Sequence, residues 1–181
     1  LFSPIYHPPE TPSHRLITCL YTETHSTEDG LLVVFYDHIR ERIGWVRSTS
    51  EGWQKPEFLD QKTGPYAAGA VDSDGKLHLA YMDPDSQSLV YLAPGSQNPE
   101  TIDDGTRDAN GEYLVEMIGE DVDLWLDSSG SPHVTYQDAT RHIFYRAKRN
   151  ETGIWTPTAI TKPDADGSYT GAHGFFSANI A

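Results

Sequence analysis

The sequence of 181 residues predicts an all-β protein, a β-propeller of four-stranded antiparallel blades with about three and a half blades in this chain. The first observation is a repeat, because residues 72–83 and 127–138 share the pattern Asp-Ser-x-Gly-x-x-His-x-x-Tyr-x-Asp without a gap. The second is that short runs of aromatic and β-branched residues alternate with turn residues, which is typical of antiparallel strands. The third is that no window of about 11 to 18 residues has the apolar spacing of an amphipathic helix.

The repeat has a period that fits one propeller blade. Its final aspartate recurs as Asp37, Asp83 and Asp138, at spacings of 46 and 55 residues. Two other markers keep the same order relative to it: a Gly-x-Tyr motif at 64–66, 111–113 and 167–169, and an apolar-x-aromatic step at 43–45, 89–91 and 143–145. Four strands in about 46 to 56 residues is typical of a blade. A β-sandwich or another meander is the alternative, but neither requires a repeated sequence.

Proline, glycine and other turn residues delimit the expected elements along the chain. We expect a Pro-rich extended arm at 1–15 and a partial propeller at 16–181, with repeat units at about 16–63, 64–110, 111–166 and 167–181. Inner strands are expected at 16–22, 66–72, 121–127 and 175–181, and second strands at 31–37, 77–83 and 132–138. Third strands are expected at 42–48, 88–93 and 142–148, and weaker fourth strands at 55–60, 99–103 and 155–160. The turn before each second strand should need a positive φ at Gly75 and Gly130.

Charge and composition limit the partners of the protein. There are 27 Asp and Glu against 13 Lys and Arg, a net charge of −14, so neither a nucleic acid nor an anionic membrane is expected as a partner. No stretch approaches about 18 consecutive apolar residues, so no membrane-spanning helix is expected. Aromatic residues make up 11 % of the chain, which indicates an ordered domain. The one cysteine, Cys19, lies in an apolar run and is expected to be a buried thiol, with intermolecular pairing as the alternative.

The repeat is followed by an apolar-x-aromatic step and by a Gly-Trp or Gly-x-Trp turn, and this combination resembles the repeat units of secreted bacterial β-propeller proteins. It resembles the sialidase-type Asp-box propellers more distantly. The Asp-box likeness rests on residues 48–53 and 149–155, in which the box aspartate is replaced and the spacing from Gly to Trp is one or two residues. The resemblance covers residues 16–181 and implies a propeller fold and an extracellular location, but no particular reaction.

The ends of the sequence give expectations about processing and assembly. The chain begins at Leu1 without a signal segment, which predicts a processed protein that is secreted or displayed at the cell surface. The last unit stops about where its next turn should begin, whereas closed propellers have about four to eight blades. We therefore expect a second chain or a homo-oligomer to complete the ring, or the N-terminal arm to close a four-bladed ring.

The recurrent polar residues are expected to serve the structure. Asp37, Asp83 and Asp138 each end a second strand, where a carboxylate accepts hydrogen bonds from the backbone of the following turn. His78 and His133 hold equivalent positions in the repeat, which favours packing or hydrogen bonding within the blade over metal ligation.

Acidic turns raise the question of calcium, because closely spaced oxygen atoms are the ligands that this ion prefers. Asp164 and Asp166 form the best candidate site. Solvated turns without a cofactor are the leading interpretation, since no segment reproduces the complete EF-hand pattern.

The candidate binding residues come first from a segment that only the third unit carries. Residues 114–121 lengthen this unit by about eight residues, and a loop on a rigid scaffold often binds ligands. This segment supplies Glu116, Glu120 and Asp121. Aromatic side chains are further candidates as stacking faces for a sugar, with core packing between blades as their alternative role; they include Trp45, Tyr91 and Trp125.

These patterns favour a non-catalytic extracellular module that binds a protein or a carbohydrate or builds an assembly, since no nucleophile, metal or phosphate motif is found. One alternative is a sialidase-like glycoside hydrolase or a polysaccharide lyase, whose catalytic groups would be shared with other blades. Another is a propeller lectin with an aromatic-lined pocket between adjacent blades.

Overall fold

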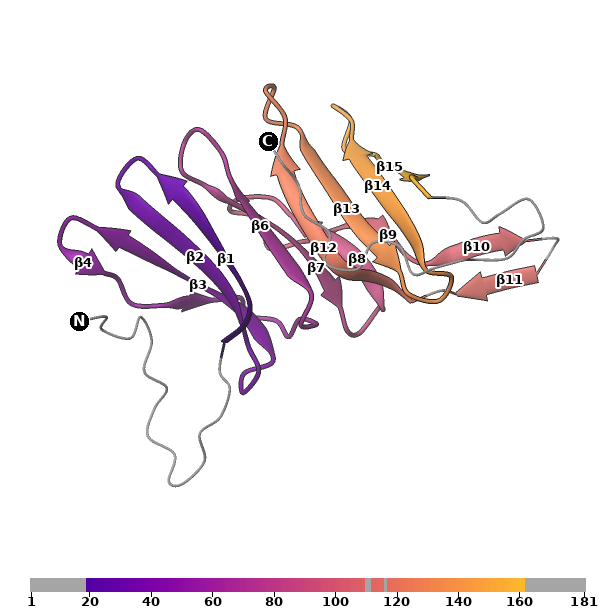
Figure 1. Cartoon of the computed structure of the whole chain (residues 1–181), viewed down its shortest axis with the longest axis horizontal. Helices are drawn as coiled ribbons and strands as arrows, with labels where there is room; N and C mark the ends of the chain where they lie inside the picture. The colour runs from indigo at the N-terminus through magenta and orange to yellow at the C-terminus, as the bar shows by residue number, and fades with distance from the viewer. Residues whose placement is uncertain (1–18, 110–111, 116, 162–181) are drawn as a thin grey trace.

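The fold consists of β-strands that form three antiparallel sheets of four or five strands and one separate hairpin (Figure 1). The computed structural model describes residues 19–109, 112–115 and 117–161. No helix occurs in these residues, so the predicted all-β class with antiparallel sheets of about four strands is confirmed. Accordingly, the described part of the chain contains no helix that is long and apolar enough to cross a membrane.

Each sheet is a meander in chain order. Sheet I contains β1 (Cys19–Thr27), β2 (Gly30–Asp37) and β3 (Arg42–Thr49), and β3 also pairs with the short strands β4 (Gly52–Trp53) and β5 (Glu57–Phe58). Sheet II contains β6 (Ala67–Val71), β7 (Leu77–Asp83), β8 (Ser88–Leu92) and β9 (Glu100–Asp103). Sheet III contains β12 (Ile118–Leu126), β13 (Pro132–Asp138), β14 (Ile143–Arg149) and β15 (Trp155–Ala159). The hairpin of β10 (Thr106–Ala109) and β11 (Glu112–Val115) connects sheets II and III.

The strands predicted from the repeat lie close to their expected positions, with two informative differences. Strands β7 and β13 have the bounds expected for second strands, 77–83 and 132–138. The inner strands differ, because β1 continues to Thr27 and β12 begins at Ile118. Both contain a break in pairing register and a residue with positive φ, Tyr21 at 50° and Asp121 at 46°. A bulge of this kind interrupts the alternation from which strand ends are predicted.

The interpretation of residues 114–121 as a loop is wrong. Leu114 and Val115 belong to β11, which pairs with β10, and residues 118–121 form the first part of β12. The acidic pair Glu120–Asp121 suggests a loop in the sequence, but it lies at the bulge of a continuous strand.

Several other expectations fall on residues that the structure does not describe. The arm at 1–15, the strand at 175–181, the unit at 167–181 and the side chain of Cys19 lie outside the described part of the chain.

The recurrent aspartates accept hydrogen bonds from the turns that follow the second strands, as predicted. In each case a carboxylate oxygen accepts a hydrogen bond from the backbone N–H two residues later, at 2.9 Å for Asp37, 3.1 Å for Asp83 and 3.0 Å for Asp138. Asp37 and Asp138 are completely buried. These side chains replace water as hydrogen-bond partners of the turn, so their main role is structural.

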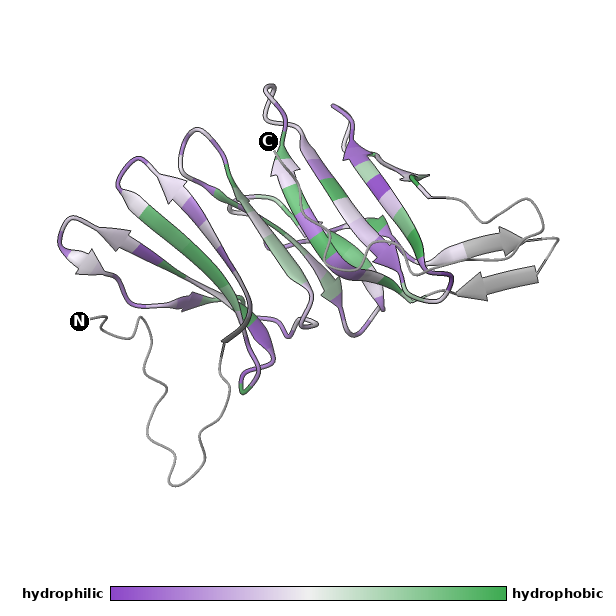
Figure 2. Cartoon of the chain, viewed as in Figure 1, coloured by the Kyte–Doolittle hydropathy of each residue, from purple (hydrophilic) through white to green (hydrophobic). Residues whose placement is uncertain are grey.

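Two apolar layers join the three sheets, which stand in a row with sheet II in the middle (Figure 1). Along β12 to β14 hydrophobic residues alternate with hydrophilic ones (Figure 2), which matches the period of two in a strand. The layer between sheets I and II contains Leu32, Val34, Ile43, Leu79, Tyr81 and Val90. The layer between sheets II and III contains Ala80, Leu89, Tyr91, Leu124, Val134 and Tyr136. In the described residues the row does not close into a ring.

Strand β6 lies between the other two sheets, and its sequence of small residues fits that place. It contacts β1 and β2 on one side and β12 on the other. A Cβ atom added at Gly69 would lie 3.0 Å from Cγ2 of Val34, so this position permits no larger side chain without a shift of the neighbouring sheet. The small side chains of β6 thus set the close approach of the sheets.

The turn glycines of the repeat generate a stability prediction. Gly75 and Gly130 have φ values of +74° and +77°, as expected. Their backbone N–H groups donate to the carbonyl oxygens of Asp72 and Asp127, at 2.9 and 2.8 Å. A Cβ atom at either position would meet nothing within 4 Å, so only backbone strain opposes a side chain there. Replacing Gly130 by Val should lower the free energy of unfolding by about 1–3 kcal/mol, as measured by urea denaturation. Gly130→Asn is the matched control and should lose less, because Asn tolerates positive φ; a Val variant as stable as the parent would contradict this account.

Candidate functional site

A groove runs between sheets I and II and is the candidate site that the geometry defines best. Its central hollow has a volume of about 700 Å³ and lies between Trp45, Arg47 and Glu57 on sheet I and residues 75–77 and 92–96 of sheet II. A hollow of about 390 Å³ adjoins it and shares Trp45 and Ser96, among other lining residues. A third hollow of about 780 Å³ shares Arg47 and Gly75 with the central one. The three hollows follow one another along the same cleft.

Strand pairing places the polar and aromatic groups of the central hollow side by side. Trp45 lies on β3 opposite Glu57 of β5, and Arg47 follows two residues later on the same face of β3. Trp45 is half-buried against the layer between sheets I and II, so part of its ring remains open to the groove. The hollow therefore has an aromatic wall flanked by a cation and a carboxylate.

The equivalent cleft between sheets II and III is closed. Tyr91 of β8 occupies the position of Trp45, and its ring lies 5.3 Å from that of Trp155 between centroids. Arg149 donates two hydrogen bonds to Glu100, at 2.7 and 2.9 Å, and the indole of Trp155 donates to the same carboxylate at 3.3 Å. These groups fill the cleft between sheets II and III and link the two sheets by hydrogen bonds.

Turn length explains why one cleft is open and the other closed. In sheet III, Arg146 pairs with Thr158 twelve positions later, and Trp155 begins β15 directly after the turn between them. In sheet II, Tyr91 pairs with Glu100 only nine positions later, so the connection is three residues shorter. The shorter turn has no counterpart of Trp155, and Ala93, Pro94, Gly95 and Ser96 line the groove in its place.

The residues singled out in the sequence do not form one site. Trp45 lines the groove, whereas Tyr91 is 3 % exposed in the closed cleft and serves packing. Trp125 lies on the opposite face of sheet III, stacked on His133 with centroids 4.8 Å apart. Glu120 and Asp121 lie at the bulge of β12. Three further candidates, Glu116, Asp164 and Asp166, lie outside the described residues.

Two acidic residues at the bulge of β12, Glu120 and Asp121, lie near two tyrosines, Tyr21 and Tyr66. The rings of Tyr21 and Tyr66 lie 5.2 Å apart. Burial raises the pKa of Tyr66 to about 12, and the carboxylate of Glu120 contributes to this increase. Burial, followed by the charge of Asp121, also raises the pKa of Glu120. This cluster therefore contains a carboxyl group that ionises less readily than an exposed one.

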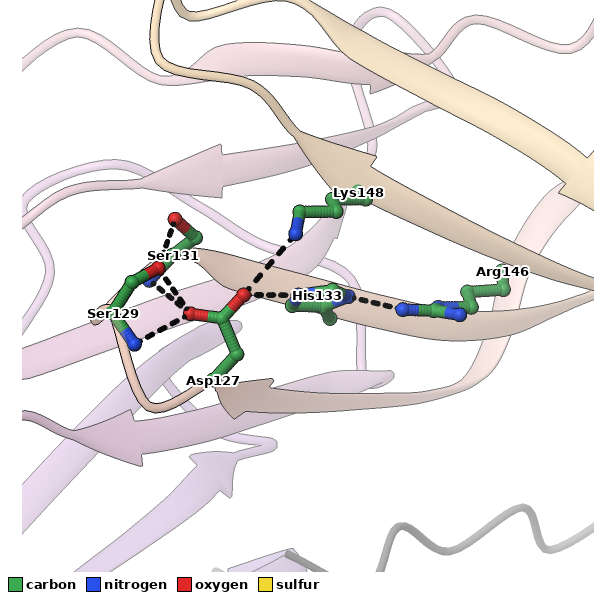
Figure 3. A network of polar contacts seen from close by, with 6 residues as sticks. All are labelled: Asp127, Ser129, Ser131, His133, Arg146 and Lys148. Atoms are coloured by element: carbon green, nitrogen blue, oxygen red, sulfur yellow. Dashed lines mark hydrogen bonds and ion pairs between the residues drawn. The ribbon is translucent and has the colours of Figure 1, made fainter.

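A polar network occupies the outer face of sheet III (Figure 3). His133 Nε2 lies 2.9 Å from Asp127 Oδ2, and His133 Nδ1 lies 2.7 Å from Nη2 of Arg146. A guanidinium group only donates hydrogen bonds, so Nδ1 accepts and the ring proton lies on Nε2, which donates to Asp127. Hydrogen bonds from Ser129, and also from His133, the Ser131 N–H and Lys148, hold the pKa of Asp127 far below its usual range.

Sheet II contains the same arrangement with a different third group. His78 Nδ1 lies 2.6 Å from the hydroxyl of Tyr91, and His78 Nε2 lies 3.4 Å from Asp72 Oδ2. Hydrogen bonding of both repeated histidines is confirmed. Sequence reasoning missed the third group, although a signal was available: it lies eight residues after the recurrent aspartate, as Tyr91 in sheet II and Arg146 in sheet III. Trp45 holds the same position in sheet I.

Neither metal ligation nor a relationship to known proteins adds to this geometry. Among the described residues no group of three or more His, Cys, Asp or Glu side chains is placed to hold a metal ion. No protein-family model matches the chain, and no curated protein matches it significantly.

The buried His78 generates a prediction about pH. Burial lowers the pKa of His78, so below about pH 6.5 the unfolded chain binds a proton that the folded chain resists. Stability from this group is present above the unfolded pKa and is lost as the pH falls. Urea denaturation at pH 7.5 and 5.5 should show a smaller loss of stability in His78→Gln than in the parent. The exposed His38→Gln is the matched control, and an unchanged pH dependence in His78→Gln would contradict the prediction.

Proposed function

We propose that this chain is a non-catalytic carbohydrate-binding module and that its three sheets are blades of a β-propeller. The observation that carries the proposal is the groove at Trp45, which stays open where the equivalent cleft is filled by Tyr91 and Trp155. The repeated sequence, the meander in each sheet and the face-to-face packing in chain order support the propeller.

The chemistry of the groove favours a sugar chain. A pyranose ring has an apolar face that packs on an indole, and its hydroxyls both donate and accept hydrogen bonds. Trp45 offers the aromatic surface, and Arg47 and Glu57 beside it offer a donor and an acceptor. The succession of three hollows suits an extended oligosaccharide better than a single small molecule.

The same residues give less support to a hydrolase. A glycosidase needs two carboxyl groups about 5 to 10 Å apart across the scissile bond. Among the described residues that line the central hollow, Glu57 is the one carboxylate. The acidic residues of the two neighbouring hollows are Asp60 in the hollow of about 390 Å³ and Glu28, Asp29, Asp72 and Asp74 in the hollow of about 780 Å³. Binding without bond cleavage is the function that this distribution favours.

Three parts of the wider hypothesis stay predictions. An extracellular location rests on the family resemblance. Completion of the ring by a second chain or by a homo-oligomer rests on the number of blades that closed propellers contain. A protein ligand in place of a glycan is an outcome that the binding experiment distinguishes.

The proposal predicts that Trp45 dominates ligand binding. A glycan array selects the saccharide, and calorimetric titration then measures its affinity. Trp45→Ala should weaken binding at least about tenfold, since truncating a central aromatic anchor costs on the order of 2 kcal/mol. Trp53→Ala is the matched control, because Trp53 lies on the same sheet, is 39 % exposed and does not line the groove. Equal losses in the two variants, or no glycan binding by the parent chain, would contradict the proposal.

A further inference from the structure

The guanidinium group of Arg146 has a histidine and a tryptophan as neighbours. It lies on β14, eight residues after Asp138, at the position that Trp45 holds in sheet I and Tyr91 in sheet II. The side chain is exposed on the outer face of sheet III, the face that does not pack against sheet II. The repeat therefore brings a cation to the position that elsewhere faces an inter-sheet cleft.

Neutral groups hold this guanidinium in place. Its Nη2 atom donates to Nδ1 of His133, which is 3 % exposed and fixed from its other side by Asp127. Its Cζ atom lies 5.6 Å from the centre of the Trp125 ring, and Trp125 itself stacks on His133. Imidazole and indole orient the guanidinium and leave its charge uncompensated.

Acidic residues outnumber basic ones 27 to 13 in this chain, so carboxylate partners for basic side chains are plentiful. Arg40, Arg149 and Lys148 each pair with a carboxylate. Arg146 has no such partner among the described residues, and its one hydrogen bond to His133 leaves the other donors of the guanidinium unused.

Arg146 also lines a hollow. A depression of about 360 Å³ is lined by Arg146, Lys148, Thr156, Thr158 and Ile160. The ammonium of Lys148 lies 3.2 Å from Asp127, so its charge is partly balanced, and Asp127 lies on the far side of the His133 ring from Arg146 (Figure 3). An arginine, a lysine and two threonines therefore line one small space.

We propose that this hollow on sheet III is a binding site for an oxyanion, such as a carboxylate or sulfate group on a small ligand. A guanidinium fork matches the geometry of two oxygen atoms of such a group, and the threonine hydroxyls donate further hydrogen bonds. His133 and Trp125 act as positioning residues that hold the fork before the ligand arrives. The site is separate from the groove at Trp45 and does not depend on carbohydrate binding there; in a completed propeller it would lie in the cleft between sheet III and the next blade.

The test is calorimetric titration of the full chain with sodium sulfate and, separately, with sodium glucuronate, at ionic strength held constant with sodium chloride. The parent chain should bind at least one of the two anions saturably at one site. Preference for sulfate indicates a tetrahedral inorganic group, and preference for glucuronate indicates the carboxylate of an acidic sugar. Arg146→Gln should lower the affinity at least tenfold, and Arg146→Lys, which keeps the charge but loses the fork, should lower it less.

Lys55→Gln is the matched control, because it removes one positive charge at an exposed position outside the hollow. This variant should bind like the parent. The NMR signal of the Trp125 indole should shift on titration in the parent and stay unchanged in Arg146→Gln. Absence of saturable binding, or equal weakening by Lys55→Gln and Arg146→Gln, would overturn the proposal. Trp45→Ala should leave anion binding intact, so failure here is distinct from failure of the groove.

Discussion

The close packing of one sheet against the next is the constraint on which the rest of the structure depends. A four-stranded sheet is stable only when its apolar face is covered, and sheet II has two such faces because it stands between two neighbours. The small residues of strand β6 allow both neighbouring sheets to approach closely. At Gly69 the side chain of Val34 packs so near that a Cβ atom would be crowded. The recurrent aspartates then tie the turns at the ends of the sheets, so the spacing and order of the strands are fixed by a few repeated interactions.

This repeated framework leaves a small number of positions free to differ. One is the third-strand residue eight positions after the recurrent aspartate, which is Trp45, Tyr91 or Arg146. Another is the length of the turn before the fourth strand, which decides whether a side chain such as Trp155 covers the corresponding third-strand residue of the preceding sheet. Where the turn is long, the cleft is filled and tied by Glu100 and Arg149. Where it is short, a groove remains, and function can be built there without loss of the packing that holds the sheets together.

The repeat made much of the fold predictable, because turn residues and alternation are local signals. The bounds of β7 and β13, the positive φ of Gly75 and Gly130 and the turn role of Asp83 followed from them. The bulges at Tyr21 and Asp121 and the β10–β11 hairpin did not, since they depend on pairing that no local pattern specifies. For the site, Trp45 was named as a candidate from its aromatic character. The open groove and the contact of Arg146 with His133 arise from packing between strands and sheets, and required the structure.

The central claim is that the short turn between β8 and β9 opens the groove to a ligand. It is tested most directly by calorimetric titration of the array-selected saccharide into a chain in which residues 94–99 are replaced by residues 149–157, the longer segment of sheet III that carries Trp155. This graft places a tryptophan over the position of Trp45, as Trp155 lies over Tyr91. The account predicts a folded chain with a melting temperature close to that of the parent and no detectable heat of binding. Undiminished affinity in the folded graft would contradict it.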